Sequence, residues 1–414
     1  MNSAGGLRYY RSSGRTAAAD RDADLRIKSV SCRKILNSHV DFTNEFIIEF
    51  DSGEVGVGSS PQGETISIYE DRAFMINPEK IIRMLKEDLP ALKPLNQEVF
   101  DSYLQKKIPL FGRNNVFALS LAFCNAAGIP EICRTGGRGD ERPGFPRLCL
   151  NVLNGGRHAY TNPVLSDFPE YLLVANHGNL EKIIMDQNSI QKRIRERLLN
   201  LGKTLINGNP VNTFGPADNR QCIELLLEVL ESLDLSDFYD VMIDASAGDL
   251  WTENRYRFSL TDNSVKTGAE LCRYWLQLIE DYPVRYLEDP FHELDYDSWK
   301  RLTAEQNGCR IIGDNFYSSD AGRIEEGALN GYTHGAIVKP NQAGTVTDTI
   351  KAIESARMRD QIVIASHRSI STESTFLSTI SCLFHIGYIK IGPLNTDYSS
   401  VIRLNELMRM TGVT

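Results

Sequence analysis

Six short apolar runs in the second half of the chain each lead into a polar residue of a kind that does chemistry. In chain order these residues are Asp244, Glu288, Asp314, Lys339, His367 and Lys390, at intervals of 23 to 44 residues. Carboxylate oxygens are the hard ligands that Mg²⁺ prefers, and a lysine close to other cations can lose its proton and act as a base. Three acids followed by two lysines therefore predict a metal site that faces a base.

The spacing of these runs indicates which elements carry them. A strand, a helix and two loops take about 25 to 40 residues, so the repeat is typical of a (β/α)8 barrel. In such barrels the C-terminal ends of the strands meet at one mouth, where catalytic residues lie. The segment 345–360 supports this interpretation, because it places Val346, Ile350 and Ile353 on one face of an amphipathic helix.

Each candidate also has a structural interpretation that involves no chemistry. One acid at a strand end caps the following helix more often than it binds a metal, and only the combination of three acids with two lysines favours the metal. Lys390 could be a surface lysine at an edge of IKIG (389–392). His158 and His367 could be core histidines whose hydrogen bonds are satisfied by the backbone.

Composition limits the class of protein. The chain has 414 residues, 42% of them hydrophobic and 24% charged, which is ordinary for a soluble protein of two or more domains. A net charge of −9 argues against binding to nucleic acid or to a membrane surface. No apolar run approaches the roughly 18 residues of a membrane-spanning helix, and the N-terminus lacks the apolar region of a secretory signal. The eight cysteines form no CxxC pair, which favours buried thiols, so we expect a cytoplasmic protein.

The chain divides into three predicted segments. Residues 1–26 are small and polar and predict a flexible tail. Residues 27–140 predict a small α+β domain, with a hairpin formed by FIIEF (46–50), a DSGE turn and VGVGSS (55–60). Residues 141–414 predict the barrel. The segment 134–144, rich in glycine, proline and charge, is the expected linker.

The motifs, taken in order, resemble those of the enolase family. Segments that correspond to enolase segments in the same order are NVLNGGRHA (151–159), MIDASAGDL (242–250), LEDPF (287–291), IIGDN (311–315), VKPNQAG (338–344), SHRS (366–369) and IKIG (389–392). In the first domain, RKILNSHVDFTNE (33–45) is similar to the family's opening strand, and PQGETISIYE (61–70) to its mobile loop. The resemblance covers about residues 27 to 410, and seven collinear motifs are far more specific than any one of them. It implies an enolase-type (β/α)8 barrel after a smaller α+β domain, and by analogy a homodimer.

The resemblance also assigns roles on the metal side of the site. It implies that Lys339 removes the proton α to the substrate carboxylate and that Lys390 binds this carboxylate. Asp244, Glu288 and Asp314 would hold one or two Mg²⁺ ions, which stabilise the enediolate that this superfamily forms.

Other residues match the part of the enolase site that binds the phosphoryl group. Arg368 and Ser369 correspond to the pair that holds this group, and a guanidinium beside a hydroxyl suits such an anion. His158 matches an active-site histidine on a glycine-rich loop, and His367 lies beside Arg368 at the barrel mouth. Thr65 falls where a loop serine binds a second Mg²⁺, although an ordinary turn threonine is an open alternative.

The chain departs from the enolase pattern on the side of the departing hydroxyl. Enolase uses two glutamates there. The first lies in a Q-E-F element, for which this chain has Ser166 and Asp167, and the second lies in a G-D-E-G-G element, for which it has Thr213. The arginine expected in the opening strand is His39, and the mobile loop has Gln62, Glu64 and Ser67 where enolase has serine, alanine and glycine.

These departures predict a changed substrate. Replacement of a glutamate by Thr213 removes a negative charge and leaves room for an additional anionic group. We therefore expect Mg²⁺-dependent dehydration of a small phosphorus-containing carboxylate, a carboxyphosphono analogue of 2-phosphoglycerate. The pattern is similar to that of the carboxyphosphonoenolpyruvate synthases of phosphinothricin-type pathways. Asp167, His158 or water held by the metal would then assist the leaving hydroxyl. An ordinary enolase and a catalytically dead relative with a binding or structural role are the alternatives.

Overall fold

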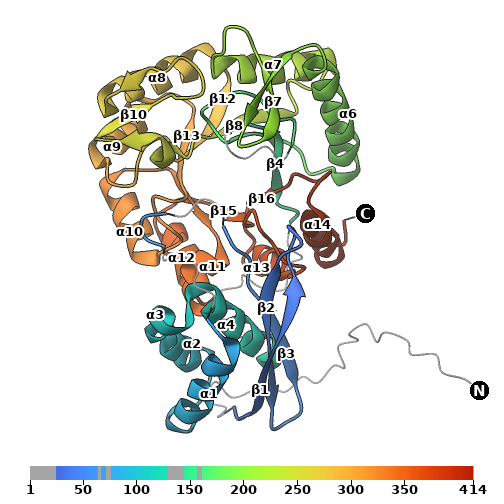
Figure 1. Cartoon of the computed structure of the whole chain (residues 1–414), viewed down its shortest axis with the longest axis vertical. Helices are drawn as coiled ribbons and strands as arrows, with labels where there is room; N and C mark the ends of the chain where they lie inside the picture. The colour runs from blue at the N-terminus through green and yellow to red at the C-terminus, as the bar shows by residue number, and fades with distance from the viewer. Residues whose placement is uncertain (1–24, 64–66, 71–75, 129–143, 156–160, 414) are drawn as a thin grey trace, which may run out of the picture.

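The computed structural model of the chain (Figure 1) describes residues 25–63, 67–70, 76–128, 144–155 and 161–413. The predicted tail falls almost wholly outside these residues, as do the domain boundary expected at residue 140 and most of the expected linker. Regular elements of the first unit run from Ile27 to Ala127, and the first strand of the second unit begins at Arg147. No helix in the described ranges is long and apolar enough to cross a membrane.

A three-stranded antiparallel sheet backed by helices forms the first unit. Gly56 and Gly58 allow α4 to lie directly on this sheet, because a Cβ atom there would come within 2.0 and 2.1 Å of backbone oxygens of that helix. Eleven of the fifteen residues of α4 are buried, as its nearly uniform apolar sequence predicts. The elements are β1 (Ile27–Leu36), β2 (Phe42–Phe50), β3 (Val55–Ser59), α1 (Pro78–Asp88), a 3₁₀ turn η1 (Leu89–Ala91), α2 (Gln97–Lys106), α3 (Ile108–Phe111) and α4 (Arg113–Ala127).

Eight strands close into a barrel in the second unit, which confirms the predicted fold class. A core of apolar side chains, among them Met242, Ile312 and Ile337, fills its interior. In the order in which they follow one another around the barrel, the strands are β4 (Arg147–Asn154), β5 (Glu170–Ala175), β8 (Tyr239–Asp244), β12 (Val284–Glu288), β13 (Arg310–Gly313), β14 (Gly335–Val338), β15 (Ile362–Ser366) and β16 (Tyr388–Ile391).

Helices cover the outside of the barrel (Figure 1). They bury an apolar stripe against the strands and expose charged residues, as α12 does with buried Val346 and Ile353. The helices are α6 (Leu180–Leu198), α7 (Arg220–Ser232), α8 (Gly268–Asp281), α9 (Tyr296–Glu305), α10 (Ala321–Asn330), α12 (Val346–Met358), α13 (Phe376–Leu383) and α14 (Tyr398–Thr411), with the short α11 (Pro340–Ala343) after β14. Small sheets β6 (Gly202–Ile206)–β7 (Asn209–Thr213) and β9 (Trp251–Thr252)–β10 (Arg255–Arg257)–β11 (Val265–Lys266) and the 3₁₀ turn η2 (Ala247–Leu250) lie between these elements.

One barrel strand runs in the opposite direction to the others. β5 pairs antiparallel with both β4 and β8, whereas the remaining neighbours are parallel. The first residue of β5, Glu170, is therefore paired with Asp244, the last residue of β8. The barrel mouth thus collects the C-terminal ends of seven strands and the N-terminal end of the eighth.

The turn between β1 and β2 joins the first unit to the barrel mouth (Figure 1). The backbone N–H of Ser38 donates to the carbonyl of Ser371 over 2.8 Å, and the N–H of Ser371 donates to Ser38 Oγ over 3.0 Å. Gln62 and Ile370 exchange two further backbone hydrogen bonds. The first unit therefore supplies part of the wall around the mouth.

Candidate active site

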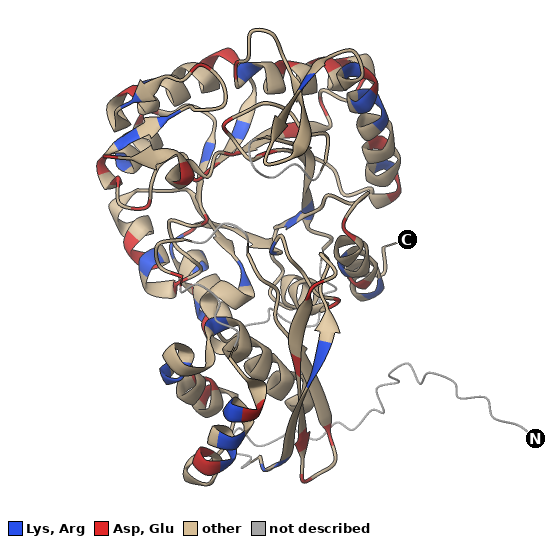
Figure 2. Ribbon diagram, viewed as in Figure 1, with Lys and Arg blue, Asp and Glu red and all other residues tan. Residues whose placement is uncertain are grey.

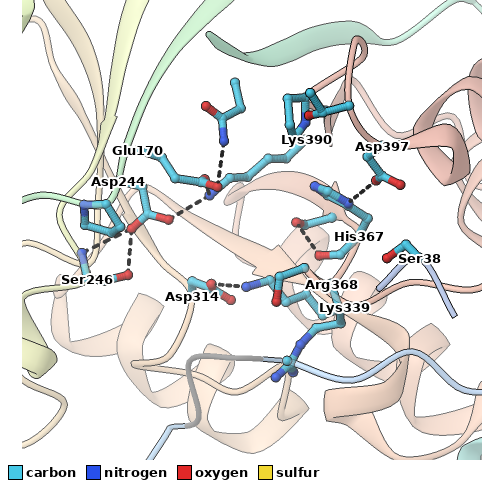
Figure 3. Close-up of a pocket in the computed structure, with 18 of the residues that line it drawn as sticks. Ser38, Glu170, Asp244, Ser246, Asp314, Lys339, His367, Arg368, Lys390 and Asp397 are labelled. Atoms are coloured by element: carbon cyan, nitrogen blue, oxygen red, sulfur yellow. Dashed lines mark hydrogen bonds and ion pairs between the residues drawn. The ribbon is translucent and has the colours of Figure 1, made fainter. Parts of the chain in front are cut away.

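A cavity of about 470 Å³ opens at the barrel mouth (Figure 3). Its lining combines side chains from the strand ends with Ser38, His39 and Gly63 from the first unit. The charged and polar residues that carry the argument below are Glu170, Asp244, Asp314, Lys339, His367, Arg368, Ser369, Lys390 and Asp397.

Lys390 lies at the centre of a group of carboxylates. Its Nζ is 2.8 Å from Asp244 Oδ2, 2.7 Å from Glu288 Oε2 and 2.8 Å from Glu170 Oε2. Burial alone would lower the pKa of this ammonium, but Asp244, Glu170 and Glu288 raise it well above its ordinary value. Lys390 is 5% exposed, which excludes the alternative of a surface lysine.

The pKa values of the two carboxylates at the ends of β8 and β12, Asp244 and Glu288, shift in opposite directions. Burial raises the pKa of Glu288 well above its ordinary value, and the neighbouring charge of Asp244 raises it further. Burial also acts to raise the pKa of Asp244, but Lys390 outweighs it and the net shift is downward. Ser246 supports the ionised form of Asp244 by donating its N–H over 3.1 Å and its hydroxyl over 2.8 Å to Oδ1.

Lys339 faces the third carboxylate, on the other side of the cavity from Lys390 (Figure 3). Lys339 directly follows β14, and its backbone N–H donates to Ser319 Oγ over 2.8 Å. Its ammonium forms an ion pair with Asp314, and the two side chains are 15% and 4% exposed. The strand β14 thus delivers a nearly buried amine to the mouth, as the sequence predicts.

The three predicted metal ligands have suitable chemistry for a hard divalent cation. Asp244, Glu288 and Asp314 lie at the ends of adjacent strands and offer only oxygen, and Asp314 Oδ1 is buried and has no hydrogen-bond partner among the described residues. Each of the three pairs with a lysine, and within the described ranges no three acidic, histidine or cysteine side chains already converge as a ready metal cluster. The three carboxylates fit Mg²⁺ when the ion takes the place of Lys339 and Lys390 as the counter-charge of the acids.

Arg368 occupies the end of the cavity next to the first unit. Its Nη1 is 2.9 Å from Glu70 Oε2, and Glu70 Oε1 accepts from Gln342 Nε2 over 2.9 Å. Gly63 packs on the guanidinium so closely that a Cβ atom would lie 1.5 Å from Nη2, so a side chain at this position would displace the guanidinium. Ser369 also lines the cavity, and the charge of the Arg368 guanidinium is balanced by Glu70 in this arrangement. Thr65 lies outside the described residues.

His367 follows β15 and faces Asp397, with Nδ1 3.8 Å from Asp397 Oδ2. Burial lowers the pKa of His367 to about 3, and the nearby Arg403 acts in the same direction. The imidazole is therefore neutral near neutral pH and cannot serve there as a cation. His158, the other predicted histidine, lies outside the described residues.

Asp167 and Thr213, which the sequence predicts on the leaving-group side, are not among the residues that line the described cavity. Asp167 is buried in a network in which it accepts from the N–H of Leu260 over 2.8 Å, from Asn219 Nδ2 over 3.2 Å and from the hydroxyl of Thr261. This network fixes the loop before β5 to α7 and to the segment before β11. Thr213 ends β7, where it pairs with Gly202 in a small hairpin.

Glu170 is the acid that the sequence prediction missed. The structure places Glu170, rather than Asp167, among the cavity-lining residues of this side. Its surroundings, PEY (169–171), match the Q-E-F element in type, because an acid precedes an aromatic residue and an apolar strand. In this register the Q-E-F element would lie three residues later than the one assumed from the sequence. The sequence signal that could have identified Glu170 is the apolar run YLLVA (171–175), which follows it directly and forms the rest of β5.

Comparisons with known proteins agree with this geometry. The family model described as "Enolase, C-terminal TIM barrel domain" matches residues 144–412. An enolase of Acidothermus cellulolyticus is 27% identical over 412 residues, which span 93% of this chain and 94% of that protein. An enolase of Ehrlichia ruminantium (strain Welgevonden) is 27% identical over 413 residues, or 93% of this chain and 96% of that protein.

Proposed function

Because the chain belongs to the enolase family, we propose that it is a Mg²⁺-dependent lyase that removes the α-proton and the β-hydroxyl of a 2-phosphoglycerate-like acid. The observation that carries the proposal is the convergence on one cavity of a base candidate, Lys339, an acid candidate, Glu170, and a carboxylate-binding lysine, Lys390. Arg368 and Ser369 supply the end of the cavity that suits a phosphorus-centred anion.

The reaction divides between the two sides of the cavity. Lys339, as the free amine, takes the proton from the carbon next to the substrate carboxylate. The electron pair of that C–H bond forms the C=C bond, and the C–O bond breaks with its own pair. The hydroxide takes a proton and leaves as water. We assign this second proton to Glu170 in its protonated form, because it is the acid that the reversed strand β5 places at the cavity.

Bound Mg²⁺ would be held by Asp244, Glu288 and Asp314 and would stabilise the negative charge that develops on the substrate carboxylate. With Mg²⁺ as the counter-charge of these acids, the Lys390 ammonium at the barrel mouth would be available to bind the same carboxylate. The metal ion and the Lys390 ammonium would together balance the negative charge of the reacting carboxylate while Lys339 removes the proton.

We favour a carboxyphosphono analogue of 2-phosphoglycerate as substrate, with carboxyphosphonoenolpyruvate as product. The support in the sequence is the replacement of the second enolase glutamate by Thr213, which is not among the residues that line the described cavity, and of the opening-strand arginine by His39, which lines it with Ser38. Loss of a glutamate on this side of the barrel removes a negative charge that would repel an added carboxylate.

An ordinary enolase acting on 2-phosphoglycerate is the second candidate. Glu170 favours it, because one acid of the leaving-group side is present at the cavity. The similar bacterial proteins carry the name enolase. A catalytically dead relative is disfavoured by four buried ionisable groups (Asp244, Glu288, Asp314 and Lys390) kept close to the partly buried Lys339. Burial of such groups is unfavourable unless they serve a purpose.

The ratio of kcat/KM for the carboxyphosphono analogue and for 2-phosphoglycerate tests this choice. We expect a ratio well above one for the wild type, and a shift toward 2-phosphoglycerate for Thr213→Glu, which restores the charge. Thr213→Val is the matched control, because it changes polarity without adding charge. A wild-type ratio at or below one would return the chain to the ordinary enolase reaction.

We also propose a cytoplasmic homodimer that binds no nucleic acid or membrane. Acidic and basic residues are interspersed over the outer helices (Figure 2). Leu36, Val40 and Phe42, at the end of the β1–β2 hairpin, are 52%, 74% and 63% exposed and form an apolar surface suited to a second copy of the chain. Light scattering coupled to gel filtration tests this, and a Phe42→Glu variant should run as a monomer.

A further inference from the structure

His367 faces a fixed carboxylate that belongs to another element (Figure 3). Asp397 directly precedes α14, and its Oδ2 lies 3.8 Å from His367 Nδ1, with the two side chains 12% and 11% exposed. Ser399 donates its N–H and its hydroxyl to Asp397 Oδ1 over 2.9 and 2.6 Å, and Ser400 donates its hydroxyl to Oδ2 over 2.8 Å. Because it caps α14, this carboxylate keeps its place opposite the imidazole.

The carboxylate determines which ring nitrogen carries the proton. His367 Nδ1 is buried and makes no hydrogen bond to any residue that the structure describes. A separation of 3.8 Å is about 1 Å longer than an N–H···O bond, and hydrogen bonds in active sites commonly shorten when substrate binds. A carboxylate can only accept, so the neutral ring places its proton on Nδ1 and leaves the lone pair on Nε2.

The groups around His367 keep the ring neutral. Burial is the largest influence, and the positive charges of Arg403, Lys390 and Lys339 add to it, while Asp397 acts in the opposite direction without outweighing them. Arg403 is itself buried on α14, where its Nη1 donates to Ser399 Oγ over 2.8 Å. A neutral ring with a fixed tautomer is a hydrogen-bond acceptor of defined direction.

We propose that Asp397 is a positioning residue that holds His367 as the Nδ1–H tautomer, so that Nε2 accepts a hydrogen bond from the substrate hydroxyl that leaves. This inference rests on the proposed function. When the hydroxyl donates to Nε2, its oxygen lone pairs remain available for the proton from Glu170. The same lone pair on Nε2 repels an anion, which keeps the phosphorus-centred group at Arg368.

Asp397→Asn is the discriminating variant. Its Oδ1 would continue to accept the two bonds from Ser399, so α14 remains capped and the NH₂ group faces His367. An amide NH₂ donates, so Nδ1 must accept and the proton moves to Nε2. The ring then presents a donor to the hydroxyl, as after the equivalent change in a serine protease triad.

Nitrogen NMR of protein labelled with ¹⁵N-histidine reads the tautomer without any need for activity, and His367→Asn identifies the signal. We expect Nδ1–H in the wild type and Nε2–H in Asp397→Asn. With substrate, kcat for dehydration should fall at least about 100-fold with KM changed by less than about threefold, while exchange of the α-hydrogen with deuterated water continues. Ser400→Ala, which removes one donor but keeps the carboxylate, should retain the wild-type tautomer and rate.

An Nε2–H signal in the wild type, or an unchanged dehydration rate in Asp397→Asn, would overturn the inference. If Asp397→Asn does not fold, Asp397→Ser keeps a good helix cap but removes the partner of Nδ1, and an unchanged tautomer there contradicts the inference equally. Wild-type protein that neither exchanges the α-hydrogen nor dehydrates either acid would instead refute the proposed function. The NMR result would then still decide the tautomer.

Discussion

The parallel strands and the reversed strand β5 bring residues to the same cavity from opposite ends of the strand. The parallel strands meant are the six from β8 to β16. On the parallel strands the polar residue lies within one position of the last residue, as with Asp244, Lys339 and Lys390. On β5 it is the first residue, Glu170. A residue's place along its strand therefore predicts its place at the mouth only after the strand's direction is known.

The parallel strands and the reversed strand β5 also differ in the chemical roles proposed for their residues. The parallel strands supply the carboxylates and lysines proposed for metal binding and proton removal, while β5 supplies the acid proposed for the departing hydroxyl. Glu170 contacts Lys390 over 2.8 Å, so the two groups of residues meet at one ammonium. Variants on either side should therefore separate the two halves of the reaction.

The largest effect is expected for Lys339→Ala on the parallel side. Without the amine, removal of the α-proton should slow by about 10³-fold or more, because no other described group occupies its side of the cavity as a base. Mass spectrometry of substrate incubated in deuterated water measures this exchange, and calorimetry should show that substrate still binds. Normal exchange would exclude Lys339 as the base.

Glu170→Gln tests the reversed strand and should have the next largest effect. Dehydration should slow by about 10²-fold to 10³-fold while α-hydrogen exchange persists, because only the hydroxyl loses its proton source. Asp167→Asn is the matched control: it should lower the free energy of unfolding by about 1 to 3 kcal/mol through its buried network and leave the ratio of exchange to dehydration unchanged. The reverse pattern in these two variants would restore Asp167 as the acid.

Glu288→Gln should have the smallest effect, on metal binding. We expect Mg²⁺ affinity measured by calorimetry to fall at least about tenfold, since even groups that merely support metal ligands typically have effects of this size. Glu305→Gln, on the exposed face of α9, is a control with the same change in charge. Equal affinity in the two variants would remove Glu288 from the metal site.

The barrel could be predicted from the sequence because apolar runs of strand length recur before Asp244, Glu288 and Asp314 at regular intervals. The hairpin of the first unit followed from its alternation and its DSGE turn. These patterns depend only on neighbours along the chain.

Glu170 and Asp397 could not be found in this way. The direction of β5 depends on its pairing with β4 and β8, which no local pattern records. Asp397 lies in an ordinary helix cap, and only its distance from His367 distinguishes it. Asp167 was selected by its type, yet partners about 50 and 90 residues away, Asn219 and Leu260, engage it elsewhere.

The turn at residues 37–41 has a consequence for how such proteins diversify. It brings Ser38 and His39 to the cavity from a unit that contributes none of the strand ends. Mutations in this turn would alter the wall of the cavity and leave the strand-end residues in place, so we expect them to change substrate preference more than the proposed chemistry. Grafting this five-residue turn between relatives is accordingly a direct route to altered selectivity.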